Sequence, residues 1–519
     1  MRAVFVLFDT LIRGALSPYG GNPDLTPNFA RLARRSVTYD RHYVGSLPCM
    51  PARRDLHTGR LSFMHRSWGP LEPFDDSFPE ILGENGVYSH LVSDHYHYWE
   101  DGGATYHNRY ATYDFIRGQE ADPWKAMVAP PWERLRSLYH ALQYSEDLRS
   151  KYRIHMINRE FIRKDEDFPS HQCFTAGLDF IDRNKGADGW LLQIETFDPH
   201  EPFFAPARLR DKLPTDYRGP ILDWPPYARV TQAPEECAEL RANYLALLAF
   251  CDEQLGRLLD EFDRHHLWDD TALIVTTDHG FLLGEHDWWA KVRMPVYQEV
   301  AHIPLFIHHP GHARAGGTRR SALTQTPDLM PTLLDFFGVS APADVTGRSL
   351  LHSLGFPGAK VHDAVLFGHW GAAVNLTDGQ HTYFRYPKET SAGDIYQYTL
   401  MPTHMTSRFG TAELAAATLS APLPFTKNVP LLRVPGTDKS PTRWLAPGFY
   451  ADCNTVLYDT DADPRQLKPL RDPVAESRLC GLMLELMQHN HAPEELYARL
   501  DLDFDAGHGQ NLATSSKRA

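Results

Sequence analysis

The sequence predicts an α/β protein with a large, doubly wound, mostly parallel sheet and a smaller C-terminal α+β subdomain. Two observations support this: strand-length apolar runs alternate with helical stretches, and the last third changes character. A chain of 519 residues exceeds the length at which one core stops growing. We therefore expect a large domain over 1–358, a smaller one over 359–505 and a flexible tail over 506–519.

Four short apolar runs share an unusual ending. They are AVFVLFD ending at Asp9, VYSHLVSD at Asp94, GWLLQIETFD at Asp198, and TALIVTTDH at Asp278 and His279. Nearly continuous apolar runs of this length are typical of parallel strands covered on both faces. Helices are predicted between them over 28–35, 77–85 (after an Asp-Ser cap) and 236–264, and this alternation implies right-handed crossovers.

The C-terminal third follows other patterns. Residues 361–387 alternate aromatic and β-branched side chains around a Thr377-Asp378-Gly379 turn, which predicts an antiparallel hairpin. The Pro- and Thr-containing stretch 388–450 predicts irregular structure or an insertion. A helix is expected over 473–489.

Composition excludes several classes of protein. The chain is 42% hydrophobic and 23% charged, and a net charge of -14 disfavours nucleic acid as a partner. The apolar run in MRAVFVLFDTLIRG is too short for a signal peptide or membrane span. The six cysteines are scattered without a CxxC pair, so we expect reduced thiols in a cytoplasmic protein that needs no membrane.

The strand-end acids predict a cation site. Ligands of doubly wound sheets bind beyond the carboxyl ends of the strands, where the loops converge. A single Asp there is often only a helix cap. Four of them, one followed by His279, are better explained by carboxylates that gather around a cation.

The stretch SLPCMPARRDLHTGR, residues 46–60, places Cys49 between two prolines and ahead of Arg53, Arg54 and Arg60. A thiol held in a rigid turn among cations is expected to ionise more readily than usual. The alternative is an ordinary loop cysteine.

Cys49-Met50-Pro51-Ala52-Arg53 matches the CxPxR signature of type I sulfatases, and LHTGR resembles the sequence that follows it. Further blocks occur in the expected order: FDPHEPF, TTDHGFLLGEHDWWAK, PDLMPTLLDFFGV and LYDTDADP. The chain thus resembles the formylglycine-dependent sulfatases and the phosphonate monoester hydrolases of the alkaline phosphatase superfamily. This resemblance implies an alkaline-phosphatase-like fold.

The resemblance also implies roles for individual residues. Cys49 would be oxidised to formylglycine by a formylglycine-generating enzyme, and its hydrated aldehyde would be the nucleophile that Arg53 holds. His200 and Lys291 would bind the sulfate oxygens and protonate the leaving group. His97 either reaches the site or is a packed, hydrogen-bonded loop residue, and His286 is expected to support the site from outside.

The implied metal ligands are Asp9, Cys49, Asp278 and His279. Many sulfatases have Asp-Asp and Asp-Asn where this chain has Asp9-Thr10 and Asp278-His279. One carboxylate fewer and one imidazole more favour a single manganese or zinc ion, with calcium still open. The same departure resembles the phosphonate monoester hydrolase branch.

The leading hypothesis is therefore a hydrolase of small-molecule sulfate esters that also accepts phosphonate monoesters or phosphodiesters. One alternative is primarily a phosphonate monoester hydrolase or phosphodiesterase, and another is a phosphatase-like enzyme with an unmodified Cys49. An inactive binding or scaffold homologue is the alternative from a different class. The Tyr-, Trp- and His-rich segment 95–125 suits an aromatic or sugar leaving group, and segment 388–450 could serve a homo-oligomer interface.

Overall fold

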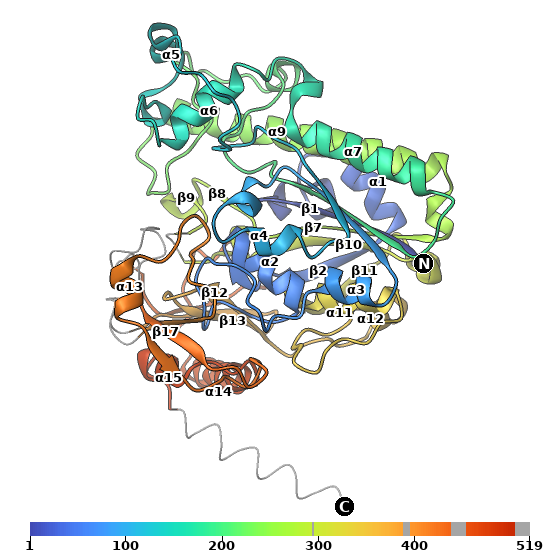
Figure 1. The fold of residues 1–519 in the computed structure, drawn as a ribbon, viewed down its shortest axis with the longest axis vertical. Coiled ribbons are helices and arrows are strands. Elements are labelled where there is room, and N and C mark those ends of the chain that lie inside the picture. The colour runs from blue at the N-terminus through green and yellow to red at the C-terminus, as the bar shows by residue number, and fades with distance from the viewer. Residues whose placement is uncertain (293–294, 388–394, 437–452, 504–519) are drawn as a thin grey trace, which may run out of the picture.

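The computed structural model describes residues 1–292, 295–387, 395–436 and 453–503. Its centre is an eight-stranded sheet in the order β11-β2-β10-β7-β1-β6-β4-β5. Figure 1 shows β1, β7, β10, β2 and β11 in the middle of the molecule. The strands are β1 (Arg2–Phe8), β2 (Val37–Tyr43), β4 (Tyr88–Ser93), β5 (Thr112–Phe115), β6 (Trp190–Thr196), β7 (Thr271–Thr277), β10 (His302–His308) and β11 (Arg319–Gln325). Only the pairs of β10 with β2 and β7 are antiparallel, so the mostly parallel α/β fold is confirmed.

The side chains of β1 contribute to two hydrophobic cores, one on each face of the sheet, because successive side chains of a strand point to opposite faces. Val4, Val6 and Phe8 pack in the core beneath α1 (Pro27–Arg35), α7 (Pro169–Asn184) and α9 (Pro234–Arg264). Phe5 and Leu7 pack in the other core, beneath α2 (Cys49–Thr58), α3 (Phe78–Glu84), α11 (Leu329–Phe336) and α12 (Leu351–Gly355). Figure 1 shows these two helical layers on either side of the sheet.

The predicted helices 28–35, 77–85 and 236–264 are confirmed as α1, α3 and α9, with ends that differ by one or two residues. The cap expected at the start of α3 is wrong in detail. Ser77 occupies the N-cap position, but its hydroxyl pairs with His57 Nδ1 at 2.8 Å instead of capping the helix.

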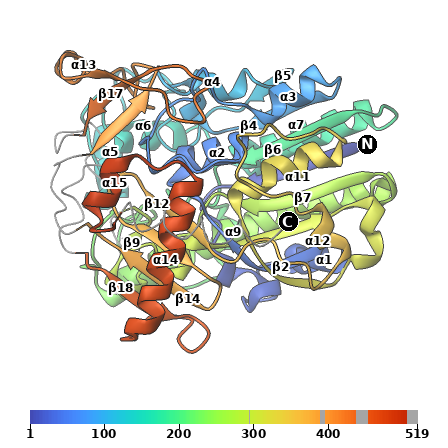
Figure 2. The ribbon, with the colours of Figure 1, turned by 90° about the horizontal axis from the view of Figure 1, so that it is seen from below.

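A second sheet has the order β18-β14-β13-β12-β3. Its strands are β3 (Ser46–Leu47), β12 (Val365–His369), β13 (Val374–Thr377), β14 (His381–Arg385) and β18 (Val456–Asp459). The hairpin predicted over 361–387 is present as β13 and β14, with Gly379 at φ 87° in the turn, and β12 adds a third antiparallel strand. Helix α14 (Pro473–His489) confirms the predicted helix, and in Figure 2 it lies across this sheet with α15 (Glu494–Arg499).

The short strand β3 comes from the N-terminal part of the chain yet pairs in parallel with β12. The second sheet therefore includes the two residues that precede Pro48 and Cys49. The division of the chain near residue 358 stays a prediction.

The expectation of irregular structure over 388–450 is only partly right for the part that the structure describes, because short strands and a helix interrupt the irregular backbone of residues 395–436. A three-stranded sheet forms from β15 (Tyr396–Thr399), β16 (Thr418–Ser420) and β17 (Leu431–Pro435), and α13 (Thr411–Ala415) lies beside it. Leu431 packs there with Phe74 and Phe425, so a contact with the N-terminal part of the chain stabilises strands too short to give a clear pattern. Residues 388–394, 437–452 and the predicted tail 506–519 lie outside the described residues.

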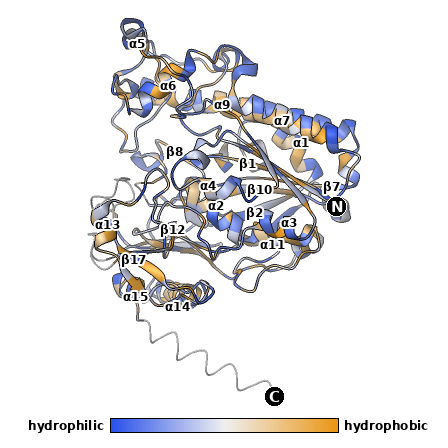
Figure 3. Cartoon of the chain, viewed as in Figure 1, coloured by the Kyte–Doolittle hydropathy of each residue, from blue (hydrophilic) through white to orange (hydrophobic). Residues whose placement is uncertain are grey.

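Figure 3 shows hydrophilic and hydrophobic stretches alternating along the helices that cover the sheet. Among the helices of the described ranges, none is both long and apolar enough to cross a membrane.

Candidate active site

The four strand-end acids follow neighbouring strands, since β7, β1, β6 and β4 are adjacent in the sheet. Only Asp9 and Asp278 belong to the buried group of potential metal ligands. Asp94 accepts a hydrogen bond from the backbone N–H of Phe197 at 2.7 Å. Asp198 accepts hydrogen bonds from the side chains of Gln119 at 2.7 Å and Ser170 at 2.5 Å. The expectation that all four acids converge is thus wrong for this pair, which instead fixes the loops around the site.

Cys49 is the first residue of α2 and not part of a turn. Its thiol sulfur lies 3.2 Å from Nε2 of His279 and 3.8 Å from Oδ1 of Asp9. Burial and the charge of Asp9 raise the pKa of the Cys49 thiol well above its ordinary value. The expected thiolate is therefore not favoured.

Two of the three arginines near Cys49 in the sequence bind partners other than the thiol. This explains why the predicted ionisation of Cys49 is not favoured. Arg54 forms an ion pair with Asp75 at 2.7 Å. Arg60 binds the backbone carbonyl of Asp344 and lies over the ring of Phe425. Both guanidinium groups thus have partners other than the thiol.

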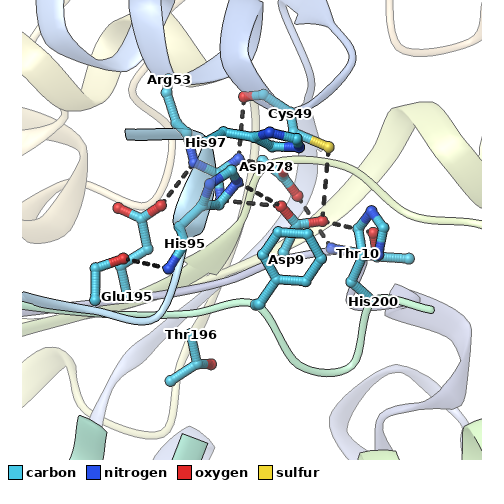
Figure 4. Close-up of polar contacts among 12 residues, drawn as sticks. Asp9, Thr10, Cys49, Arg53, His95, His97, Glu195, Thr196, His200 and Asp278 are labelled. Carbon is cyan, nitrogen blue, oxygen red and sulfur yellow. Dashed lines mark hydrogen bonds and ion pairs between the residues drawn. The ribbon is translucent and has the colours of Figure 1, made fainter. Parts of the chain in front are cut away.

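Asp9, Cys49, Asp278 and His279 offer one ligand atom each, and these atoms all lie within 4.8 Å of one another. All four side chains are buried, and Figure 4 shows Asp9 and Asp278 beside the Cys49 thiol. Burial raises the pKa of Asp9, but Arg53 and Lys291 outweigh it and hold that pKa well below its usual range. Burial and the neighbouring Asp9 raise the pKa of Asp278 to about 7. The four residues predicted as metal ligands are thus brought together.

Arg53 is buried within the site, with 1% of its surface exposed. Its guanidinium donates to Asp9 at 2.9 Å, to Asp278 at 2.6 Å and to Glu195 at 2.6 Å, as the dashed lines of Figure 4 show. It also donates to the carbonyl of Cys49 at 3.0 Å, so one cation joins three carboxylates and the cysteine backbone.

Glu195 was not predicted as a site residue. It lies within β6 and also accepts hydrogen bonds from the hydroxyl of Tyr98 and the amide of Gln193. The signal in the sequence was the pair of polar residues Gln193 and Glu195 inside an apolar strand run. Residues of this kind are rarely buried without a specific partner.

Lys291 faces Oδ1 of Asp9 at 3.8 Å, whereas Arg53 donates to the other carboxylate oxygen. Its ammonium donates to Oγ1 of Thr10 at 3.0 Å, and the Thr10 hydroxyl donates to Asp9 at 2.6 Å. Burial lowers the pKa of Lys291, but Cys49, Glu201 and Asp9 raise it above its ordinary value. Lys291 is therefore a charged residue within the site, as the resemblance implies.

His200 differs from the expected cation. Burial and the charge of Lys291 lower the pKa of His200 well below its ordinary value, so the imidazole is neutral in this environment. Its Nδ1 donates to the backbone carbonyl of Glu201 at 2.5 Å, and its ring packs against Phe197.

The two histidines of the segment SDHYHYW contact different partners. His95 was not predicted, yet its Nε2 is 3.6 Å from Oδ2 of Asp9. His97 pairs with Glu100 at 2.5 Å and packs against Trp68, with its ring centroid 5.1 Å from that of His95. The described contacts fit the packed, hydrogen-bonded alternative for His97.

His286 stacks on Tyr297 with ring centroids 3.7 Å apart and lies 3.4 Å from Glu299. Among the contacts of the described residues, none joins it to the four clustered ligands.

The comparisons with known proteins agree with this geometry. The sulfatase family model matches residues 2–339, and the model of the N-sulphoglucosamine sulphohydrolase C-terminal region matches residues 284–399. An N-acetylglucosamine-6-O-sulfatase of Bacteroides thetaiotaomicron is 26% identical over 445 residues, covering 76% of each chain. A multifunctional alkaline phosphatase superfamily protein of Trinickia caryophylli is 27% identical, covering 63% of this chain and 70% of that protein.

Solved structures show the same fold. The phosphonate monoester hydrolase of Agrobacterium radiobacter has a TM-score of 0.61 at 18% identity, covering 94% of this chain and 95% of that one. A structure in complex with its substrate D-glucosamine-2-N,6-O-disulfate has a TM-score of 0.62 at 17% identity, covering 95% and 98%. The family match spans well over half of the sequence. The chain belongs to the sulfatase family and is a sulfuric ester hydrolase.

Proposed function

We propose that this enzyme hydrolyses small-molecule sulfate esters through a formylglycine made from Cys49, with one divalent metal ion bound beside it. The observation that carries the proposal is the buried group of Asp9, Cys49, Asp278 and His279. Arg53 supplies one positive charge to three buried carboxylates, so the remaining negative charge would favour a metal ion beside them.

The donor set fits a metal ion, since two carboxylates, an imidazole and the side chain of residue 49 converge within 4.8 Å. A mixed oxygen and nitrogen set favours manganese or zinc over calcium. When bound, such an ion acts as a Lewis acid that offsets negative charge on the ester.

The formylglycine explains why a cysteine with an unfavourable thiolate occupies this position. In a hydrated aldehyde, one hydroxyl can attack sulfur or phosphorus, and the other can then expel the product and restore the aldehyde. Arg53, which donates to the backbone carbonyl of residue 49, would orient this group.

The side of the site that holds Lys291 and His200 suits the leaving group. Lys291 supplies a fixed positive charge where negative charge develops. An anionic ester bound beside His200 favours its imidazolium form. That ring could then release the Nε2 proton to the leaving oxygen, while Nδ1 keeps its proton and donates it in a hydrogen bond to the Glu201 carbonyl.

A second activity toward phosphonate monoesters or phosphodiesters is part of the proposal. Thr10 replaces a second acid beside Asp9, and His279 replaces a neutral amide beside Asp278. A less negative site tolerates an anionic phosphoryl group as well as a sulfuryl group, because both are tetrahedral and meet the same cations. The multifunctional relative of Trinickia caryophylli supports this breadth.

Two measurements test the proposal. Mass spectrometry of the peptide that contains Cys49, from protein coexpressed with a formylglycine-generating enzyme, should give the mass of an aldehyde in place of a thiol. Steady-state kinetics with 4-nitrophenyl sulfate and a phenylphosphonate ester, after reconstitution with manganese, zinc or calcium, should show both activities in a ratio that depends on the metal. An unmodified thiol in fully active enzyme would contradict the nucleophile, and strict sulfate specificity with calcium alone would contradict the second activity.

A further inference from the structure

Glu201 is a fully buried carboxylate on the side of the site opposite Arg53. The Tyr227 hydroxyl donates a hydrogen bond to its Oε1. Its Oε2 accepts no hydrogen bond from the described residues, although it is shielded from solvent. Burying a carboxylate oxygen in this way is costly, so the groups that Oε2 faces need an explanation.

Two groups face this oxygen. Nδ1 of His200 lies 3.3 Å from Oε2, and the ammonium of Lys291 lies 3.9 Å from it. Lys291 is also 3.8 Å from Oδ1 of Asp9. The ammonium thus lies at almost equal distances from a carboxylate of the cation site and from Glu201.

These distances have a simple electrostatic consequence. Attraction to Asp9 alone would draw Lys291 toward the cation site, where Thr10 already accepts its hydrogen bond. Glu201 opposes this pull and holds the ammonium at the side of His200. The same carboxylate faces the Nδ1–H edge of His200, so it favours the ring orientation in which Nε2 is left for the substrate.

The loop itself does not depend on the Glu201 carboxylate. The N–H of His200 donates to the carbonyl of Phe197 at 2.9 Å, and the N–H of Phe203 donates to the carbonyl of Asp223 at 2.7 Å. These backbone bonds fix the turn that carries His200. The side chain of Glu201 is therefore available for another task.

We infer that Glu201 is a positioning residue that holds Lys291 and His200 in place for protonation and charge stabilisation of the leaving group. The inference rests on the proposed function, and it assigns to Glu201 no contact with the substrate. Tyr227 anchors the carboxylate through its hydroxyl.

The test is the dependence of kcat/KM on leaving-group pKa, measured on metal-reconstituted full-length enzyme. The substrates are 4-nitrophenyl, 4-chlorophenyl and phenyl sulfate, which need increasing help to expel the leaving oxygen. Misplacing a catalytic group can cost about 100-fold, and we expect Glu201→Ala to lose about that factor with phenyl sulfate. With 4-nitrophenyl sulfate, whose leaving group needs little protonation, we expect a loss of about 10-fold or less.

Two further variants separate charge from shape. Glu201→Gln keeps the size of the side chain and an acceptor for Tyr227 but removes the charge, so it should behave like Glu201→Ala. Tyr227→Phe keeps the charge of Glu201 but removes its anchor. Its loss of kcat/KM should therefore vary less with the leaving group than the loss in the two Glu201 variants.

Asp252→Asn is the matched control. Asp252 is also a buried carboxylate, but it accepts hydrogen bonds from the backbone of Asn28 and Phe29 at the start of α1. Its replacement should lower stability without changing the ratio of the three rates.

The outcomes are distinguishable. An equal loss on all three esters in the Glu201 variants, or no loss, would overturn the inference while the active wild type upheld the proposed function. A wild type with no sulfatase activity would overturn both. A crystal structure of Glu201→Ala in which Lys291 and His200 keep their places would also contradict the inference.

Discussion

On one side of the site Arg53 faces three carboxylates, whereas on the other Lys291 and His200 face Glu201. The Arg53 side carries more negative than positive charge, and this suits the binding of a cation. With Asp9 counted on the Arg53 side, the Glu201 side is close to balanced, because the Lys291 ammonium faces the Glu201 carboxylate and the imidazole is neutral. Under the proposed function, the first side would hold the metal ion and residue 49, and the second would face the leaving group.

The largest effect is expected for Cys49→Ala, which tests the Arg53 side of the site. It removes the nucleophile but leaves the carboxylates and His279 in place, so we expect kcat to fall by at least about 10⁴-fold. Metal content by elemental analysis should fall much less, because water can replace the lost ligand. Full activity in purified protein would contradict the assignment of the nucleophile.

Asp278→Asn should act on the metal first. It removes a charged ligand that also accepts a hydrogen bond from Arg53 at 2.6 Å. We expect at least about 100-fold weaker metal binding, since even residues outside the ligand set can cost 10- to 100-fold. Turnover should fall in parallel with metal content, and stoichiometric metal in the purified variant would show that the ligand set is wrong.

Glu195→Gln should have a smaller effect. The amide still accepts from the Arg53 Nε–H but no longer neutralises the guanidinium, so Arg53 should bind Asp9 and Asp278 more tightly. Because partners of this kind typically contribute 10- to 100-fold, we expect a loss of about 10-fold in kcat and weaker metal binding. An unchanged metal affinity would place Glu195 outside the charge balance of the site.

His286→Ala should have the smallest effect. His286 stacks on Tyr297, so we expect a change in kcat of about twofold or less and a loss of stability of about 1 kcal/mol. Thermal unfolding and kinetics on 4-nitrophenyl sulfate would measure both. A large loss of activity in a stable variant would restore the supporting role predicted from the sequence.

Local patterns predicted the sheet and the placing of strand-end acids at its edge, whereas the resemblance to the sulfatases supplied the full set of proposed ligands. Strand runs that end at Asp9 and Asp278 place those residues at one sheet edge through parallel pairing with β1. The converse assumption, that every strand-end acid shares one site, was wrong for Asp94 and Asp198, since local pattern does not show whether a side chain binds the loop beside it.

Long-range contacts were the part that could not be predicted. The charge state of Cys49 depends on how deeply it is buried and on where Arg54 and Arg60 find partners. Glu195 reaches the site from β6, where Arg53 donates to it, and His95 reaches it from the loop after β4, where it lies 3.6 Å from Asp9. The strands of segment 395–436 are too short to show a period, and they form because they pack against distant residues such as Phe74.

The pairing of β3 with β12 has a consequence for the order of events during synthesis. Ser46 pairs with Gly368, about 320 residues later in the chain. At about 5–20 residues per second, a ribosome needs roughly 15–60 s to make that intervening length. Throughout this interval the strand leading to Cys49 has no partner on that side. If Cys49 is converted to formylglycine as proposed, this interval of tens of seconds is one in which the modifying enzyme would meet the strand before Cys49 without its β12 partner.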